Sequence, residues 1–325
     1  ARWDEVRRRV ADLVAGELPD DAVHPVSAVT LHRPFEVGDY VDFYASEHHA
    51  TNLGRILRPD SEPLLPNWKH LPVGYHGRAG TVVVTGTDVV RPCGQRTAEG
   101  GPVFGPSQRL DIEAEIGFVV GTPTGLGAPV GPDAFAEHVF GVVLVNDWSA
   151  RDIQAWEYQP LGPFLGKSFA TSIGHWVTPL EALEAAKTAA PEQDPAPLAY
   201  LRESERFGYD LSLAVAWNGV EVSRPPFAQL YWTPAQQLAH MTANGASLRT
   251  GDLFASGTIS GPDRDQRGSF IELTWGGAEP VRLGEGVERT FLEDGDTVTI
   301  TATAPGPGGA VLGLGEVTGT IAAAR

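Results

Sequence analysis

Two glutamates separated by one residue are the first sign of chemistry in this sequence. Glu113 and Glu115 lie in segment 111–120, Asp-Ile-Glu-Ala-Glu-Ile-Gly-Phe-Val-Val, which has the composition of a strand with an apolar end. Side chains two residues apart on a strand point to the same face. Two carboxylates on one face repel each other unless they share a cation or a proton. An isolated Glu-x-Glu more often lies on an exposed strand face, so the pair alone does not define a site.

Two aspartates are candidates to complete an acidic site. Asp147 closely follows the apolar run 140–145, and a carboxylate at a strand end is typical of a pocket group. Asp42 lies in a stretch rich in aromatic residues. Either aspartate, taken alone, is more often a cap or turn residue. Four carboxylates converging on one point would call for Ca²⁺ or Mg²⁺, which take oxygen ligands. Spacing by itself groups only Glu113 with Glu115.

A general base would be sought among the histidines. The candidates from the sequence alone are His48, His49, His70 and His76. A histidine is activated when a carboxylate holds its second ring nitrogen. Glu272 lies in segment 269–274, Ser-Phe-Ile-Glu-Leu-Thr, where its alternation with apolar residues by itself indicates an exposed strand position.

The elements that must position these residues are mostly short strands between glycine- and proline-containing turns. Strands are predicted at 81–85, 116–120, 140–145, 211–217, 269–274 and 297–303. Helices are predicted at 1–16, 132–138 and 233–242. The Pro/Ala-rich segment 181–200 is predicted to be a surface excursion. The pattern therefore predicts a mainly β fold with minor helices, built on a rolled or barrel-like mixed sheet.

Composition limits the possible partners. The formal net charge of -17 argues against nucleic acid and anionic membranes, although a bound cation can still make a pocket attractive to an anionic substrate. No apolar run approaches the ~20 residues of a membrane span. Cys93 is the only cysteine, which excludes an intrachain disulfide and favours a reducing, cytoplasmic location.

Five long motifs carry a resemblance to a known family. Segment 42–52 reads Asp-Phe-Tyr-Ala-Ser-Glu-His-His-Ala-Thr-Asn, and segment 65–78 reads Leu-Pro-Asn-Trp-Lys-His-Leu-Pro-Val-Gly-Tyr-His-Gly-Arg. Segments 146–158 and 160–168 read Asn-Asp-Trp-Ser-Ala-Arg-Asp-Ile-Gln-Ala-Trp-Glu-Tyr and Pro-Leu-Gly-Pro-Phe-Leu-Gly-Lys-Ser, and 255–261 reads Ala-Ser-Gly-Thr-Ile-Ser-Gly. From about residue 30 onward, the chain resembles the fumarylacetoacetase family.

The resemblance implies a fold, a reaction and an assembly. The implied reaction is the hydrolysis of the carbon–carbon bond of 4-fumarylacetoacetate to fumarate and acetoacetate, the last step of tyrosine and phenylalanine breakdown. The implied fold is a mixed β-sandwich roll, and the implied assembly is a homodimer. Family members carry an SH3-like domain before the catalytic one. Residues 1–28 are interpreted as the helix and connection that trail such a domain, which is itself largely missing, and residues 29–325 as the catalytic β-roll.

The resemblance also assigns roles to individual residues. The metal ligands implied are Asp42, Glu113, Glu115 and Asp147, with Lys167 and Thr171 placed around a second, structural cation. Catalysis is assigned to His49 as base, Glu272 as its partner, and Arg151, Gln154 and Lys167 as stabilisers of negative charge. Substrate contacts are assigned to Tyr44, Arg58, Tyr75, Gln154, Tyr158 and Thr258, because arginine and tyrosine suit carboxylate recognition. A protonated ammonium cannot ligate a cation, so only the backbone oxygen of Lys167 would do so.

Two other functions are weighed against this one. A related enzyme, such as an acylpyruvate hydrolase or an oxaloacetate decarboxylase, would keep the Glu-x-Glu and Asp residues but lack motifs 42–52 and 65–78. A non-catalytic binding protein would lose the base or the charge-stabilising donors. The sequence retains both motifs and all of these donors, which favours the family hydrolase.

Overall fold

A mixed eight-stranded sheet forms the centre of the molecule. The computed structural model describes residues 3–284 and 286–325. The sheet order is β2 (Gly74–His76), β1 (Tyr40–Phe43), β17 (Leu253–Ala255), β8 (Ala114–Val120), β9 (Val139–Asp147), β11 (Thr171–Ile173) and β3 (Val82–Val84), and β12 (Thr178–Pro179) also pairs with β9. Strands β8 and β9 are antiparallel over most of their length and are almost entirely buried. Their continuous apolar runs reflect burial on both faces.

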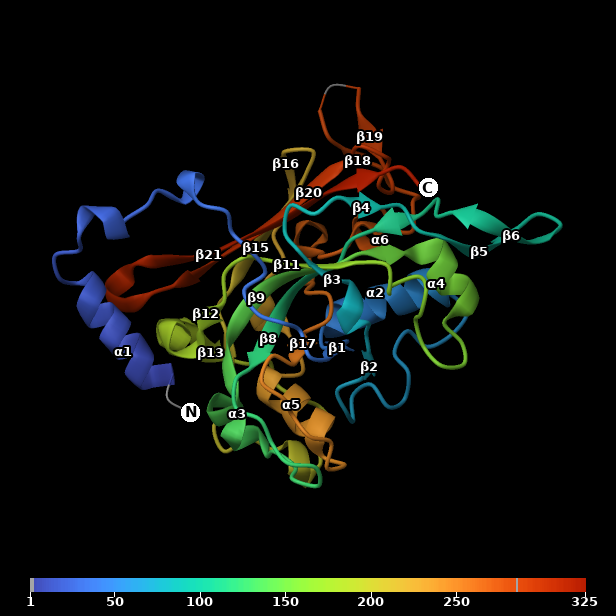
Figure 1. Cartoon of the computed structure of the whole chain (residues 1–325). Helices are drawn as coiled ribbons and strands as arrows, with labels where there is room; N and C mark the ends of the chain where they lie inside the picture. The colour runs from blue at the N-terminus through green and yellow to red at the C-terminus, as the bar shows by residue number, and fades with distance from the viewer. Residues whose placement is uncertain (1–2, 285) are drawn as a thin grey trace.

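A second sheet of five strands packs against the first. Its order is β16 (Val220–Ser223), β15 (Ser212–Trp217), β20 (Thr297–Pro305), β21 (Val311–Ala322) and β4 (Val89–Val90). Strands β20 and β21 contact β9, and Figure 1 shows this pair, in red, crossing the first sheet. Alternating burial along β15 and β20 directs one face of the second sheet into the main core.

Small helices and two-stranded pairs cover the ends of the sheets. The α-helices are α1 (Trp3–Val14), α2 (Glu47–Leu57), α3 (Phe135–His138), α4 (Arg151–Glu157), α5 (Pro234–Thr242) and α6 (Phe270–Leu273). The pairs are β5 (Cys93–Ala98) with β6 (Gly101–Pro106), β7 (Leu110–Asp111) with β10 (Ser149–Ala150), β13 (Lys187–Ala189) with β14 (Phe207–Tyr209), and β18 (Val281–Arg282) with β19 (Glu288–Arg289). Among the described helices, none combines the length and apolarity needed to cross a bilayer.

Short 3₁₀ turns join these elements. They are η1 (Asp20–Ala22), η2 (Val26–Ala28), η3 (Ala79–Thr81), η4 (Pro132–Ala134), η5 (Leu180–Ala186), η6 (Ala199–Leu201), η7 (Phe227–Gln229), η8 (Arg264–Gln266) and η9 (Pro307–Gly309). The turn η5 buries Leu183 and Ala186 in the core, so the prediction that 181–200 is wholly a surface excursion is wrong at its beginning. For the burial of this turn, the apolar side chains at helical spacing matter more than the Pro/Ala-rich composition of the whole segment.

The predicted fold class is confirmed, and so are most of the predicted elements. The prediction of a strand at 269–274 is wrong, because residues 270–273 form helix α6. All four residues of α6 are buried, so the alternation of apolar residues held no information about an exposed face. The predicted strand at 111–120 is interrupted at residues 112–113, where the chain passes from β7 to β8. Helices α2 and α4 were not predicted.

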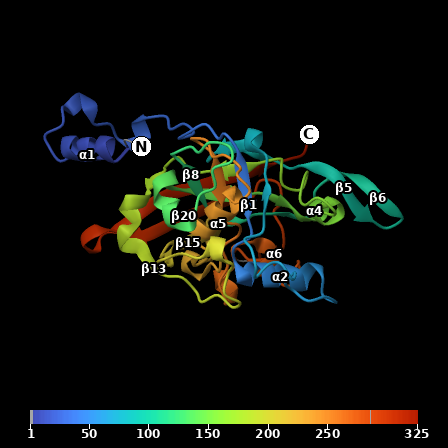
Figure 2. The ribbon, with the colours of Figure 1, turned by 90° about the horizontal axis from the view of Figure 1, so that it is seen from below.

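The N-terminal helix confirms the predicted helical periodicity but buries little of its apolar face. Trp3 packs edge-on against Phe140 of β9, with ring centroids 5.5 Å apart. The remaining members of the apolar face are exposed, namely Val6, Val10, Leu13 and Val14. Figure 2 shows α1 and the connection after it at one side of the body. The first two residues of the predicted helix lie outside the described residues.

Candidate active site

Four buried carboxylates meet near the middle of the large sheet. Asp42 comes from β1, Glu115 from β8 and Asp147 from the end of β9, while Glu113 directly precedes β8. One oxygen of each of the four lies within 4.8 Å of the others, and all four side chains are buried. The backbone amide of Asp147 donates to the carbonyl of Glu113 at 3.1 Å, which fixes these two segments side by side. The structure therefore brings together the four residues that sequence spacing could not group.

The chemistry of this cluster fits a hard cation. Asp42 Oδ1 and Glu115 Oε1 are buried and have no hydrogen-bond partner among the described residues. Burial and the repulsion of Asp147 raise the pKa of Asp42, and burial and the repulsion of Asp42 raise the pKa of Glu115. Oxygen atoms that lack donors and share negative charge are suitable ligands for Ca²⁺ or Mg²⁺.

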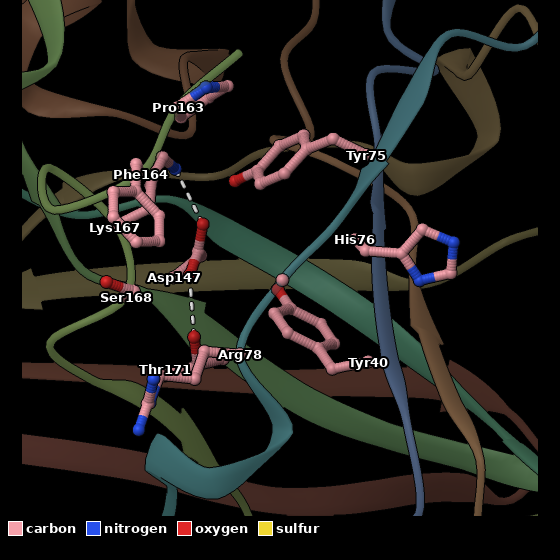
Figure 3. Close-up of a pocket in the computed structure, with 11 residues that line it drawn as sticks. Tyr40, Tyr75, His76, Arg78, Asp147, Pro163, Phe164, Lys167, Ser168 and Thr171 are labelled. Atoms are coloured by element: carbon pink, nitrogen blue, oxygen red, sulfur yellow. Dashed lines mark hydrogen bonds and ion pairs between the residues drawn. The ribbon is translucent and has the colours of Figure 1, made fainter. Parts of the chain in front are cut away.

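Lys167 pairs with the other two carboxylates of the cluster. Its ammonium donates to Glu113 and, at 2.6 Å, to Asp147, and Thr171 donates its hydroxyl proton to Asp147 at 2.7 Å. Burial opposes ionisation of Glu113, but the attraction of Lys167 and Arg151 is stronger, so that the pKa of Glu113 is lowered. Figure 3 shows the Lys167–Asp147–Thr171 chain at the edge of a cavity of about 220 Å³.

Tyr75 lies on the opposite side of the same cavity. Its phenol points towards Lys167 and Asp147 in Figure 3, and Tyr75 pairs with Asp42 across strands β2 and β1. The aromatic ring of Phe164, from the loop after α4, also lines the cavity. A substrate in this cavity would therefore contact both the carboxylate cluster and a phenolic donor.

His49 sits between the cluster and a second buried carboxylate. Ser46 caps helix α2 by accepting from the His49 backbone amide at 3.1 Å, which places His49 in the first turn. The ring Nδ1 lies 2.6 Å from Glu272 Oε2, and Nε2 lies 3.8 Å from Glu113 Oε1. An ionised carboxylate only accepts, so Nδ1 carries the proton of the neutral ring and Nε2 is left as the acceptor that faces the cluster.

Glu272 is held in place by an unusually complete set of donors. Besides His49, Oε2 accepts from Ser260 at 2.9 Å and Ser269 at 2.7 Å, and Oε1 accepts from Asn52 at 2.9 Å. Burial raises the pKa of Glu272, but His49 and the hydrogen-bond donors outweigh burial, so the net shift of this pKa is downward. An ionised Glu272 therefore accepts the proton carried by Nδ1 of His49 and fixes the orientation of the ring.

Arg151 and Gln154 meet the cluster from helix α4. Arg151 Nη1 lies 2.8 Å from Glu113 Oε1 and donates to Gln154 Oε1 at 3.1 Å. Its Nη2 is buried and has no hydrogen-bond partner among the described residues. A buried cationic N–H without a partner suits an anion that arises next to it, because the low local dielectric strengthens their attraction.

Tyr44 and Arg58 share a second, smaller cavity of about 110 Å³. The ring of Tyr44 packs edge-on against the ring of His49, with centroids 5.3 Å apart. Arg58, at the end of α2, donates from Nη2 to the carbonyl of Pro63 at 3.0 Å, while its Nε is buried without a partner among the described residues. This cavity is therefore lined by the Arg58 guanidinium and by Tyr44, whose ring contacts the predicted base.

The remaining predicted substrate contacts differ in their placement. Thr258 is buried, and its hydroxyl has no partner in the described part of the chain. The preceding Gly257 has a φ of 75°, and a Cβ there would lie 2.1 Å from the Phe43 carbonyl, so only glycine allows this approach. The phenol of Tyr158 instead accepts from Gln159 at 2.9 Å, and Tyr158 lines neither of the two cavities above.

Sequence reasoning missed the residues that support this site. Asn52, Ser260 and Ser269 orient Glu272, and Asp111 pairs with Arg151 Nε at 2.8 Å. Asn52 lies one helical turn after His49, so an expected helix at this segment would have placed both side chains on one face. For Asp111, the signal was its place two residues before Glu113, at the start of the segment that was predicted to be one strand.

Known proteins resemble this chain over nearly its whole length. The family profile described as "Fumarylacetoacetate (FAA) hydrolase C-terminal" matches residues 40–322. The fumarylacetoacetase of Rattus norvegicus is 48% identical over 338 residues, which cover 99% of this chain and 80% of the relative. The fumarylacetoacetase of Arabidopsis thaliana is 47% identical over 336 residues, with 98% and 79% covered.

A solved structure of lower identity shows the same fold. It is maleylpyruvate hydrolase from Sphingobium in complex with manganese(II) ion and pyruvate, which matches with a TM-score of 0.57 and 14% identity over 100% of this chain and 84% of that one. From the family profile and from the high identity to the two relatives over nearly its whole length, the chain belongs to the fumarylacetoacetate hydrolase family.

Proposed function

We propose that this chain hydrolyses 4-fumarylacetoacetate to fumarate and acetoacetate, the last step of tyrosine and phenylalanine catabolism. The observation that carries this function is the 48% identity to a fumarylacetoacetase across 99% of the chain. The buried His49–Glu272 pair beside four carboxylates supplies the base and the cation-binding groups that such a hydrolysis needs.

The cation that fits the cluster is Ca²⁺ or Mg²⁺. Asp42, Glu113, Glu115 and Asp147 would hold it, because all four offer oxygen ligands and two of them have unpartnered oxygen atoms among the described residues. Such a cation, when bound, polarises the two oxygens of a 1,3-diketone and stabilises an enolate leaving group. The second, structural cation near Lys167 and Thr171 stays a prediction.

Proton transfer begins at His49. Nε2 is the accepting nitrogen, and it takes a proton from the water that attacks the ketone carbon. Glu272 holds the proton on Nδ1 and stabilises the imidazolium that results. The imidazolium then returns a proton as the carbon–carbon bond breaks and the enolate becomes acetoacetate. Because Glu272 is fixed by several donors, the ring of His49 keeps one orientation throughout.

Negative charge that develops on the attacked oxygen is stabilised by cationic donors. Arg151 presents Nη2, Lys167 lines the larger cavity, and Gln154 lies beside the Arg151 guanidinium. Arg151 and Lys167 are held in place before the reaction by Glu113 and Asp147, so little reorganisation is needed when the charge appears.

Substrate carboxylates are bound in the cavities on either side of the reacting centre. Arg58 and Tyr44 bind one carboxylate in the smaller cavity, while Tyr75 and the buried hydroxyl of Thr258 orient the diketone near the cluster. The contact predicted for Tyr158 stays a prediction, because Tyr158 lines neither of these cavities.

A substrate-depletion assay tests the proposal. Purified chain with Ca²⁺ or Mg²⁺ is expected to consume fumarylacetoacetate, followed by loss of its ultraviolet diketone absorbance, and to release fumarate and acetoacetate in equal amounts. The same preparation is offered an acylpyruvate. Brisk acylpyruvate cleavage without turnover of fumarylacetoacetate would overturn the proposal in favour of a related hydrolase.

A homodimer and a cytoplasmic location are further parts of the proposal. The loop that follows α4 exposes large apolar side chains, including Leu161 and Phe164, which suits an interface with a second copy. Sedimentation equilibrium is expected to give twice the chain mass of 34.6 kDa. A single species of one chain mass at micromolar concentration would contradict the dimer.

A further inference from the structure

Asp111 is a fully buried carboxylate whose two oxygen atoms join three segments. It lies at the end of β7, and none of its side chain is exposed. Oδ1 accepts from the backbone amides of Ile112 and Phe270, both at 2.7 Å. Oδ2 accepts from Arg151 Nε at 2.8 Å and from the backbone amide of Ile271 at 3.1 Å. Asp111 thus contacts both a side chain of the reaction centre and the helix that carries Glu272.

The first of these contacts fixes the Arg151 guanidinium. Asp111 holds the Nε edge, while Glu113 and Gln154 lie at Nη1, so the planar group is held on two sides. This leaves Nη2 as the N–H group without a partner among the described residues. Without Asp111, the guanidinium is free to rotate about its side-chain bonds and to pair more fully with Glu113.

The second contact fixes helix α6. Phe270 and Ile271 directly precede Glu272, and both donate their backbone amides to Asp111. Helix α6 has only four residues, so its internal hydrogen bonds alone cannot hold it rigidly. The position of Glu272, and with it the 2.6 Å contact to His49 Nδ1, depends on this external anchor.

The backbone reinforces the same arrangement. Strand β7 pairs with β10, where Ser149 lies opposite Asp111, and the amide of Arg151 donates to the Arg109 carbonyl at 2.9 Å. The segments that carry Asp111 and Arg151 therefore cannot separate without breaking the β7–β10 pair. Helix α6 is joined to this pair by the hydrogen bonds that the amides of Phe270 and Ile271 donate to the Asp111 side chain.

We propose that Asp111 is a positioning residue for the hydrolysis, which holds the charge-stabilising Arg151 and the Glu272-bearing helix in one fixed arrangement. This inference rests on the proposed function. Asp111 acts through its two neighbours and touches no reacting atom, so its loss lowers the rate of the chemical step more than it weakens binding of substrate or cation.

Asp296 offers a matched control. It is also buried, and it accepts from Trp217 Nε1 at 3.1 Å, Asn218 Nδ2 at 2.7 Å and the amide of Glu293 at 2.9 Å, with Arg289 Nε at 3.4 Å. Its partners belong to the second sheet and its connections, and none of them is assigned to the reaction centre, although the ring of Trp217 stacks on Phe270 of α6 with centroids 4.0 Å apart. A general cost of removing a buried, arginine-paired carboxylate is therefore measured by Asp296→Asn.

The experiment compares Asp111→Asn with Asp296→Asn and combines the former with Arg151→Gln. Asp111→Asn is expected to lower kcat about 10- to 100-fold, as loss of an outer-shell partner does. KM and the Ca²⁺ affinity by calorimetry are expected to change less than about threefold, and Asp296→Asn is expected to leave kcat within about twofold of the unmodified chain. In the Arg151→Gln background, Asp111→Asn should cost clearly less than it does alone, because one of its targets is already absent.

The outcomes separate this inference from the proposed function. Absence of turnover by the unmodified chain would refute the proposed function. An active chain in which Asp111→Asn matches Asp296→Asn in kcat, or in which the effects of Asp111→Asn and Arg151→Gln are fully additive, would refute the positioning role alone. If Asp111→Asn does not fold, Asp111→Glu keeps the charge and moves the carboxylate by one methylene. A folded Asp111→Glu with unchanged kcat would also overturn the inference.

Discussion

Buried carboxylates lie on both sides of the His49 ring. Glu272 alone forms the first set, and the second set consists of Asp42, Glu113, Glu115 and Asp147. The two sets differ in whether all their oxygen atoms have hydrogen-bond partners within the protein. Glu272 accepts hydrogen bonds from three side chains besides His49, and its pKa is lowered despite burial. Asp42 and Glu115, in the other set, have oxygen atoms without partners among the described residues, and burial and mutual repulsion raise their pKa values. One set is complete within the chain, while the other keeps oxygen atoms without a donor among the described residues although Lys167 and Arg151 pair with part of it.

This difference assigns the two sets to different tasks. A satisfied, ionised carboxylate fixes a histidine and needs no further partner. A set with unpaired oxygen atoms costs free energy until a cation binds, so it is suited to holding one.

The largest effect is expected at the histidine between the two sets. His49→Ala removes the proton acceptor, so kcat should fall about 10²- to 10⁴-fold, the range for loss of a general base. The Ca²⁺ affinity by calorimetry should stay close to that of the unmodified chain. His48→Ala, one residue away and partly exposed, is the control and should keep its activity. Substantial turnover by His49→Ala would remove it as the base.

A pair of isosteric substitutions separates the two sets. Glu115→Gln removes a charge from the incomplete set and should weaken Ca²⁺ binding more than roughly tenfold, because the ligand charge is lost. Glu272→Gln removes a charge from the complete set and should leave the Ca²⁺ affinity nearly unchanged while lowering kcat at saturating Ca²⁺. Equal effects of the two variants on Ca²⁺ affinity would contradict the division of tasks.

The incomplete set also predicts how stability depends on pH. In the cation-free chain, the raised pKa values of Asp42 and Glu115 mean that the folded state keeps protons that the unfolded state releases above about pH 4. Stability is therefore fully present below that pH and is lost as pH rises through the raised pKa values.

Cation binding should reverse this loss, because it replaces the protons with positive charge. The increase in Tm on adding Ca²⁺ is expected to be larger at about pH 8 than at about pH 5. Scanning calorimetry with and without Ca²⁺ at both pH values measures it. A Ca²⁺-induced Tm increase that is independent of pH would argue against raised pKa values in the cluster.

The smallest effect is expected for an exposed ion pair outside both sets. Arg224 donates to Glu221 through two 2.8 Å hydrogen bonds, but both side chains are largely exposed. Arg224→Ala should change the free energy of unfolding by less than about 1 kcal/mol and leave kcat unchanged, because water screens such pairs. A larger loss in urea unfolding would show that charge removal itself, rather than burial, governs the effects above.

The sequence by itself determined the chemical groups and most of the β elements. Long motifs indicated the residue types of the site, and apolar runs such as 116–120 and 140–145 indicated the buried strands that carry Glu115 and lead to Asp147. These signals are local, because burial on both faces of a strand leaves a continuous apolar run in the sequence. The resemblance to a family, rather than periodicity, selected His49 over the other histidines.

Only the tertiary structure decided how these groups combine. Asp42 and Glu115 meet across β17, which lies between β1 and β8, and no spacing in the sequence specifies this strand order. Helix α6 replaced the predicted strand at 269–274, since a segment buried on every side shows no face in its pattern. Asp111 joins Arg151, which is 40 residues away in the sequence, to this helix, whose contacting residue is 160 residues away. Such contacts depend on long-range packing and hydrogen bonding, which local propensity does not encode.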